Sequence, residues 1–221
     1  MSSALFAYPK QAAFQRVLPK SKIYEHAKPS RAVRERFVAE VGQIVWQYKL
    51  SPETTNLRAR NGISEIQVFG VELKGEEVSE AVLRCIDKAI SFPIFYELAH
   101  GDRIKAMAGY KRPNDAEADK WVVDAYFETA WKATNEVREP LPVALDLAGL
   151  YELMLRAHIG LPPRDGETVR DVVTRAQAIR EKETECRKLE QRLAQEPQFN
   201  RKVELNGQLR AAKDELTSLR G

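Results

Sequence analysis

The sequence has few of the residues that build metal sites or nucleophilic sites. Its 221 residues include two cysteines and three histidines. Cys85 and Cys186 are far apart, and each lies in an apolar helical pattern, so neither a disulfide nor a cysteine-rich zinc site is expected. His26, His100 and His158 lack the spacing of metal ligands. We therefore expect no bound metal and no cofactor.

The sequence also lacks the motifs of nucleotide-binding enzymes and of membrane proteins. No glycine-rich loop joins an expected strand to a helix, so the ATP and NAD fingerprints are missing. No Gly-x-Ser-x-Gly motif supplies a serine nucleophile. No apolar segment reaches the ~18–20 residues of a membrane span, and the N-terminus has no signal-peptide pattern. We expect a cytoplasmic protein with no membrane partner.

The sequence is rich in charged residues, and they are unevenly distributed along the chain. The chain is 43% hydrophobic and 30% charged, which is typical of a soluble globular protein. Its length of 221 residues favours one core domain with an extension. The formal net charge is +3. Residues 1–62 carry eleven Lys and Arg against four Asp and Glu, whereas residues 63–163 carry eleven against seventeen. The basic excess therefore belongs to the N-terminal quarter.

The N-terminal region is expected to form an arm followed by a helix. Pro9, Pro19 and Pro29 disfavour any long helix or central strand, so residues 1–29 are predicted to be an extended basic arm. Ser30 is a suitable N-cap, and apolar residues recur at helical spacing as far as Tyr48. This spacing predicts an amphipathic helix over residues 31–48.

Residues 30–163 are expected to form a mixed α/β core domain, with a small four-stranded sheet and flanking helices. The segment 63–74 alternates like a strand and is apolar on both faces, so we expect it to be central. A helix should follow it, and then strands at 92–99, 104–111 and 121–131. The strand–helix–strand step predicts a parallel pair, and the hairpin after it makes the sheet mixed.

Residues 164–221 have the pattern of two helices that share an apolar seam. Apolar residues recur at heptad spacing before and after Pro197, which predicts an antiparallel helical hairpin of the coiled-coil type. A hairpin of this length is marginal in water by itself. Its seam should therefore be covered by the core domain, by a second copy or by a protein partner. The residues expected to dock are Leu205, Leu209, Leu216 and Leu219.

One short motif raises the possibility of a nuclease. Glu72 and Lys74 are two residues apart in the expected strand, so they share a face on which they could hold Mg²⁺ and orient a water molecule. A Glu-x-Lys nuclease needs a further acid on the neighbouring strand, and residues 54–62 contain none. The alternative is the solvated end of a strand that enters the turn at Gly75.

Cations gather around the start of the helix expected at residue 31. A helix dipole disfavours positive charge there by a few tenths to ~1 kcal/mol per residue, and phosphates would offset that cost. Alternatively, these side chains pair with the acids of the middle segment. The candidate nucleic-acid-binding residues are Lys20, Lys22, Lys28, Arg31, Arg34, Arg36, Lys49, Arg58 and Arg60.

Aromatic residues lie among these cations. Tyr8, Phe14, Tyr24 and Trp46 could stack on nucleic-acid bases, and the alternative for them is packing in the core.

Eight blocks spread over most of the chain carry a family resemblance. They are PKSKIYEH, FVAEVGQIVWQYKLSPETTNL, EIQVFGVELKG, VLRCIDKAI followed by FPIFYEL, AGYKR, YFETAW and FNRKVELN. Together they resemble an uncharacterised bacterial family that is classified only as a domain of unknown function. The resemblance implies no catalytic residues. It implies a setting, because members of that family are commonly encoded beside DEAD/DEAH-type helicases and site-specific DNA methyltransferases, in loci that look like restriction or antiphage defence systems.

The expected function combines this setting with the basic N-terminal region and the C-terminal helices. It is a non-catalytic accessory subunit of a DNA-directed defence complex. Such a subunit would bind nucleic-acid phosphates, and a helicase or methyltransferase of the same locus or a second copy of itself. The alternatives are a Mg²⁺-dependent nuclease of the Glu-x-Lys type and a structural scaffold that binds no nucleic acid.

Overall fold

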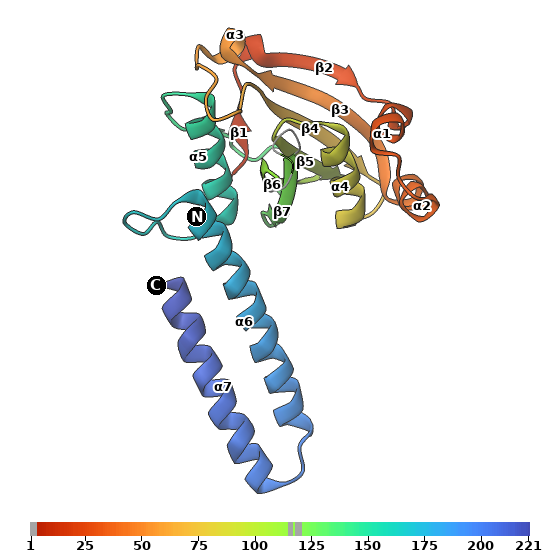
Figure 1. Ribbon diagram of the computed structural model, residues 1–221. Helices are drawn as coiled ribbons and strands as arrows, with labels where there is room; N and C mark the ends of the chain where they lie inside the picture. Colours follow the sequence, from red (N-terminus) through yellow and green to blue (C-terminus); the bar gives the residue numbers. More distant parts are fainter. Residues whose placement is uncertain (1–3, 115–116, 118–120) are drawn as a thin grey trace. The chain divides into compact units, whose positions relative to one another are not determined.

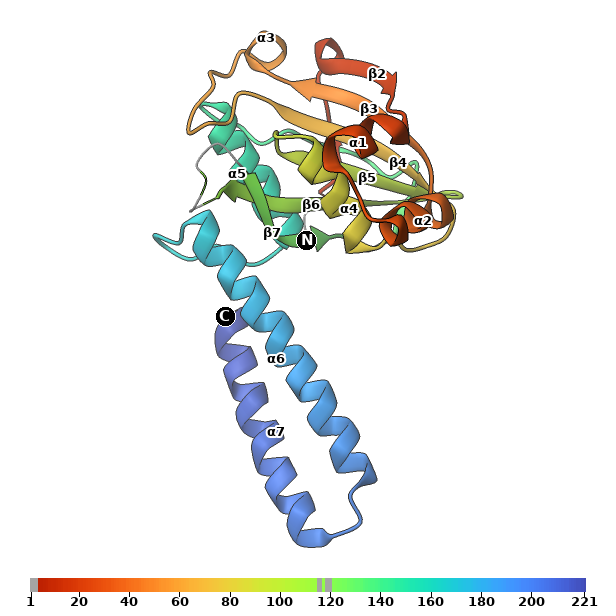
Figure 2. The same cartoon turned by 45° about the vertical axis from the view of Figure 1, so that its right-hand side comes forward.

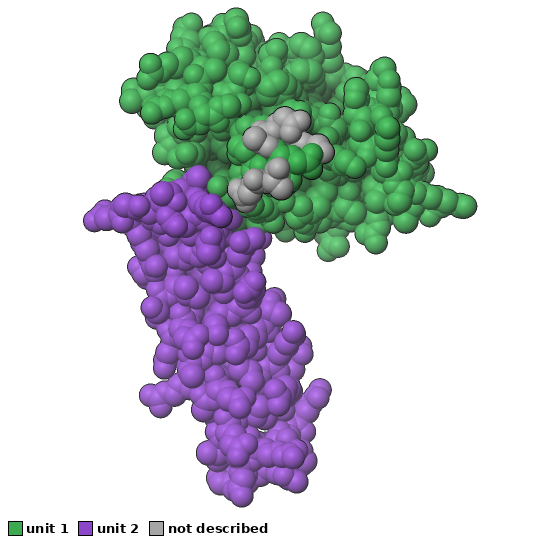
Figure 3. All heavy atoms as spheres, in the orientation of Figure 1, with its two compact units in different colours: residues 1–158 green, residues 159–221 purple. Residues whose placement is uncertain are grey.

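The computed structural model describes residues 4–114, 117 and 121–221. The chain divides into two compact units, residues 1–158 and residues 159–221, which Figure 3 colours separately. The first unit contains a β-sheet with helices on both faces, and the second contains two long helices. The predicted mixed α/β class is confirmed.

The sheet of the first unit is larger than the sequence predicted. It has seven strands rather than four, in the order β2-β3-β4-β5-β6-β7, with β8 paired to β6. The predicted parallel pair is present as β4 and β5, and all other pairings in this sheet are antiparallel. The strands are β2 (Ala13–Val17), β3 (Val41–Leu50), β4 (Ile66–Leu73), β5 (Ile94–His100), β6 (Arg103–Pro113), β7 (Trp121–Glu128) and β8 (Lys132–Ala133).

The predicted helix over residues 31–48 is wrong in its second half. Helix α2 (Arg31–Glu40) begins at Ser30 as expected, but the chain then continues directly into β3. The register of β3 against β4 shifts between Val41 and Ile44 and again between Trp46 and Tyr48. These bulges break strict alternation, and the apolar residues of a bulged strand then imitate helical spacing. The β-branched and aromatic content of this segment was the better indicator.

The N-terminal segment differs from the extended arm that the prolines suggested. It forms β1 (Phe6–Ala7), a short 3₁₀ helix (Lys10–Ala12), the edge strand β2 and helix α1 (Lys20–Ala27). Pro9 and Pro19 occupy the N-caps of the two helices, and Pro29 follows the end of α1. The prolines therefore mark the boundaries of short elements, because proline is tolerated where a helix starts.

Helices cover both faces of the sheet. Helices α1, α2 and α4 (Glu80–Ala89) lie on one face (Figure 2), where Ile23, Phe37 and Ile86 pack with Phe69 and Tyr96 of the sheet. Helix α5 (Leu147–Ile159) lies on the opposite face, because its Tyr151 ring contacts Phe95, the neighbour of Tyr96 on β5. Two short elements complete the first unit: β1 pairs in parallel with β9 (Glu139–Pro140), and α3 spans Pro52–Thr55.

The second unit consists of α6 (Val169–Gln195) and α7 (Phe199–Arg220), which lie side by side in opposite directions (Figure 1). Their shared apolar cluster contains Cys186, Leu189, Leu205, Leu209 and Ala212. Ion pairs join the two helices at Lys182–Glu215 (2.7 Å) and Lys213–Glu190 (2.8 Å). No helix in the described part of the chain is long and apolar enough to cross a membrane.

Candidate functional site

The basic surface is built from the two helices that follow β2. Lys28 is the C-cap of α1, and its backbone has the left-handed conformation (φ 49°). Ser30 is the N-cap of α2, and its hydroxyl accepts a hydrogen bond from Val33 N at 3.4 Å. Neither helix has an acidic residue in its first turn. Cations therefore lie near two helix N-termini without the usual compensating acids.

One predicted phosphate ligand is used inside the fold. Lys20 Nζ donates to Phe37 O at 3.1 Å and to Val41 O at 2.5 Å, which are carbonyls at the end of α2. Burial, and then the nearby charge of Lys74, lowers the pKa of Lys20. Lys20 therefore ties α1 to the C-terminal end of α2.

Two further cations form ion pairs within their own helices. Lys22 Nζ lies 3.0 Å from Glu25 Oε2, and Arg31 Nε lies 2.7 Å from Glu35 Oε1. The Arg31 side chain is 93% exposed and that of Glu35 is 64% exposed. Solvent-exposed pairs of this kind contribute little to stability, so a phosphate can compete for either cation.

Three cations of this surface have no carboxylate partner among the residues that the structure describes. The Arg34 guanidinium lies over the Tyr24 ring, 5.4 Å from its centroid. Lys28 and Arg36 are exposed and form no ion pair with any residue that the structure describes. Lys28, Arg34 and Arg36 are hereafter called the open cations. They are the part of the predicted set that is most available to a phosphate.

The last three predicted cations lie elsewhere, and two of them pair with acids of the core. Lys49 Nζ lies 2.8 Å from the buried Glu65 Oε2, and Arg60 Nη1 lies 3.1 Å from Asp146 Oδ2. A backbone hydrogen bond from Gly149, and then the bond from Arg60, lowers the pKa of Asp146. Arg58 forms an isolated bridge with Asp146 through its backbone. Lys49 and Arg60 thus follow the alternative in which basic residues pair with middle-segment acids.

The nuclease candidates lie at the exposed end of β4. Glu72 is exposed and lies opposite Ala99 of β5. Lys74 Nζ donates to Val38 O at 2.6 Å, which draws it toward α2. Among the described residues, no three His, Cys, Asp or Glu side chains gather in a way that could hold a metal ion. Glu72 therefore belongs to no group of three possible metal ligands in the described part of the chain.

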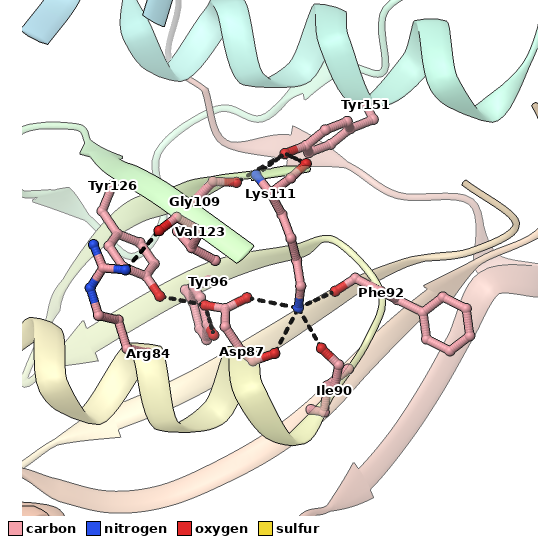
Figure 4. A network of polar contacts seen from close by, with 10 residues as sticks. All are labelled: Arg84, Asp87, Ile90, Phe92, Tyr96, Gly109, Lys111, Val123, Tyr126 and Tyr151. Atoms are coloured by element: carbon pink, nitrogen blue, oxygen red, sulfur yellow. Dashed lines mark hydrogen bonds and ion pairs between the residues drawn. The ribbon is translucent and has the colours of Figure 1, made fainter. Parts of the chain in front are cut away.

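A buried polar network that the sequence analysis missed connects α4 to three strands (Figure 4). Its centre is Asp87, which is only 5% exposed. Asp87 Oδ2 accepts hydrogen bonds from Tyr96 Oη at 2.9 Å and from Tyr126 Oη at 2.6 Å. Burial raises the pKa of the Asp87 carboxyl, and the charge of Lys111 opposes that shift. Strands β5, β6 and β7 each send one side chain to this carboxylate.

Lys111 provides the cation of this network. Its Nζ lies 3.3 Å from Asp87 Oδ1, and it also contacts the backbone oxygens of Asp87 (2.8 Å), Ile90 and Phe92 (3.1 Å). The carbonyls of Asp87 and Ile90 lie at the C-terminal end of α4, where a cation is favoured by the helix dipole, and Phe92 lies in the segment that follows the helix. Burial lowers the pKa of Lys111, and Asp87 opposes the shift.

Gly109 of β6 leaves room for the Tyr126 ring of β7, which joins the network. It pairs with Tyr126 across β6 and β7, and a Cβ atom at Gly109 would lie 3.0 Å from the Tyr126 ring and 2.9 Å from Val123. The strand register then shifts, and the freed Lys111 N–H donates to Tyr151 Oη of α5 at 2.7 Å. Tyr151 Oη donates in turn to Gly109 O at 3.0 Å.

This network is suited to holding the fold rather than to catalysis. The Lys111 ammonium is surrounded by four oxygens, and the Asp87 carboxylate is occupied by two phenols and one ammonium. A pocket of about 410 Å³ lies beside Asp87, but these contacts leave neither group free to attack or to exchange a proton. One signal was present in the sequence, because Asp87 lies on the apolar face of its helix, one turn after Leu83.

Comparison with known proteins places the chain in a family without giving it an activity. The family described as Domain of unknown function (DUF4391) matches residues 6–216, so the chain belongs to that family. No curated protein and no solved structure matches the chain.

Proposed function

We propose that the protein is a non-catalytic accessory subunit of a DNA-directed bacterial defence complex, and that it acts in the cytoplasm. In this proposal α1 and α2 bind nucleic-acid phosphates, and α6 and α7 bind a helicase or DNA methyltransferase partner. The observation that carries the proposal is the set of open cations at Lys28, Arg34 and Arg36. They have no carboxylate partner among the described residues, and no acid lies in the first turn of either helix.

The chemistry of this surface suits a polyanion. The buried cations Lys105 and Lys111 have oxygen partners inside the first unit, and so does the half-buried Lys20. The open cations instead face solvent, where the phosphates of a nucleic acid can replace released counterions. Arg31 and Lys22 flank them in weak, exposed pairs, so the same contact can recruit these two residues.

The partner half of the proposal concerns the outer surface of the helix pair. Leu205 and Leu209 are 6% and 8% exposed in the seam against α6, and Leu216 packs partly against the same cluster. Leu219 is partly exposed. With the inner leucines covered, we propose that α6 and α7 act together as one coiled-coil element. Phe199 and Val203, which are 77% and 55% exposed, give a partner or a second copy an apolar contact.

The two alternatives receive less support from the geometry. A Glu-x-Lys nuclease would need acids around Glu72, whereas Lys74 is held by Val38 O and no described acid joins Glu72 in a metal-binding group. A scaffold that binds no nucleic acid would leave the open cations without a role. Both alternatives make different predictions in a binding assay.

The test of the phosphate surface is charge reversal with a matched control. The variant Lys28→Glu/Arg34→Glu/Arg36→Glu changes three exposed cations, and the control Lys188→Glu/Lys202→Glu/Arg210→Glu makes the same change of charge on α6 and α7. We expect the first variant to weaken binding of a fluorescent DNA at low salt by at least about tenfold. The control should bind like the wild type.

The same assay separates the alternatives. Equal weakening by both variants would mean that only the net charge matters, which contradicts a defined phosphate surface. No binding by the wild type at low salt would favour the scaffold. Mg²⁺-dependent cleavage that Glu72→Ala abolishes would favour the nuclease.

The partner surface is tested by co-expression with a helicase or methyltransferase encoded beside the gene. Phe199→Asp/Val203→Asp alters only exposed side chains, so it should release the partner while the helix content stays unchanged. Retention of the partner by this variant would contradict the proposed contact.

A further inference from the structure

A second feature of the first unit lies beside the basic helices. A pocket of about 460 Å³ opens between α1, the sheet and the end of α4, which is within the ~300–1,000 Å³ range of small-ligand sites. Its walls are mainly apolar and aromatic, and Lys22 of α1 adds a positive charge to them. The lining residues that matter here are Lys22, His26, Trp46, Gln67, Phe69 and Phe92.

Gln67 supplies a fixed hydrogen-bond acceptor in this pocket. It is 4% exposed, and its amide nitrogen donates to Glu65 Oε1 at 2.6 Å. Glu65 is held in turn by Lys49, which lies 2.8 Å from its other oxygen. A carboxylate only accepts hydrogen bonds, so the Gln67 nitrogen has to face Glu65. No described residue donates a hydrogen bond to the Gln67 side-chain oxygen, so this oxygen is left to accept from a ligand.

The aromatic wall continues out of the pocket onto the edge of the sheet. The Trp46 ring lies 4.1 Å from the Phe14 ring of β2, and the Arg16 guanidinium lies 4.5 Å from the Phe14 centroid. Trp46 also contacts Phe69, another lining residue of the pocket, with 6.0 Å between the ring centroids. Flat rings and a guanidinium in such a row are the surfaces on which nucleic-acid bases stack.

We propose that this pocket receives an unstacked base of a single-stranded nucleic acid. The base stacks on Trp46, one donor on its edge bonds to the Gln67 oxygen, and its flanking phosphates lie against Lys22 and the open cations. This inference rests on the proposed phosphate surface and adds the class of its ligand. Bases in a duplex are stacked and paired, so they cannot enter a side pocket without being extruded.

The experiment compares three fluorescent DNA probes of equal length at one salt concentration: a single strand, the same strand with abasic sites, and a duplex. We expect the wild type to bind the intact single strand about tenfold tighter than the abasic strand, because stacking on an aromatic ring is lost without a base. It should also prefer the intact single strand to the duplex.

A pocket-filling variant provides the structural arm of the test. Ser91 is exposed at the pocket, so Ser91→Trp can block it without disturbing the core, and Ser64→Trp places the same side chain at an exposed site elsewhere. Ser91→Trp should bind the intact strand only as well as the abasic strand. Ser64→Trp should behave like the wild type.

The outcomes distinguish this inference from the function on which it rests. Equal binding of intact and abasic strands by the wild type would overturn the base pocket and leave phosphate binding standing. No binding of any probe at low salt would overturn both. Competition by free AMP or CMP at the same base concentration would overturn the nucleic-acid assignment in favour of a free nucleotide.

Discussion

Lys111 and the open cations of α1 and α2 lie in opposite surroundings within one unit. Lys111 Nζ is buried among four oxygens at the end of α4, whereas Lys28, Arg34 and Arg36 have no carboxylate partner among the described residues. A buried cation must be satisfied inside the fold, because leaving it alone would cost several kcal/mol. An exposed cation has no such requirement. The difference indicates that burial decides which basic residues serve stability and which can serve binding.

The largest change in stability is expected when the buried cation Lys111 is replaced. Lys111→Met removes the ammonium and leaves the buried Asp87 carboxyl without its counter-charge, so we expect the free energy of unfolding to fall by about 3–5 kcal/mol. Urea denaturation measures the change. Lys88→Met is the matched control, because Lys88 follows Asp87 directly in the sequence and is exposed. A loss below about 1 kcal/mol for Lys111→Met would show that the pair does not hold α4 to the sheet.

A double-mutant cycle sharpens this result. Asp87→Leu combined with Lys111→Met removes both charges, and it should cost less than the sum of the two single changes. Additive losses would mean that the two side chains act independently.

A buried and an exposed histidine, His158 and His26, give a second comparison, in which the pH dependence of stability is the measured effect. This effect is expected to be smaller. Burial lowers the pKa of His158 from 6.5 to about 4, whereas His26 is exposed. Between these two pKa values the unfolded chain binds a proton that the folded chain does not, so stability falls as pH drops from 6.5 to 4. The shift corresponds to about 3 kcal/mol in the free energy of unfolding.

Denaturation at several pH values tests this expectation. His158→Gln should flatten the loss of stability between pH 6.5 and 5, and His26→Gln should follow the wild type. An unchanged slope in His158→Gln would assign the pH dependence to other groups.

The sequence predicted the centre of the sheet better than its edge. The parallel step from β4 to β5 was readable because β4 is apolar on both faces and a helix with an apolar stripe follows it. Strand β3 was read as helix because its bulges disturb the period of two. The short elements of residues 1–29 were missed because edge strands and helices of one or two turns carry little periodic signal.

The sequence predicted which residue types make up the candidate site, but it did not predict their contacts. Charge counting located the basic region, yet it did not separate Lys20, which binds the carbonyls of α2, from Arg36, which has no ionic partner in the described part of the chain. That distinction depends on which turns come together in the fold. Asp87 and Lys111 were missed for the same reason, since the two lie on different elements.

The central claim is that the open cations contact phosphates, and the salt dependence of DNA binding tests it most directly. The account predicts that the logarithm of the binding constant falls linearly with the logarithm of the salt concentration for the wild type. In Lys28→Gln/Arg34→Gln/Arg36→Gln the slope should decrease in magnitude by about 2, since each contact to a single strand contributes ~0.7. An identical slope in the wild type and this variant would contradict the claim.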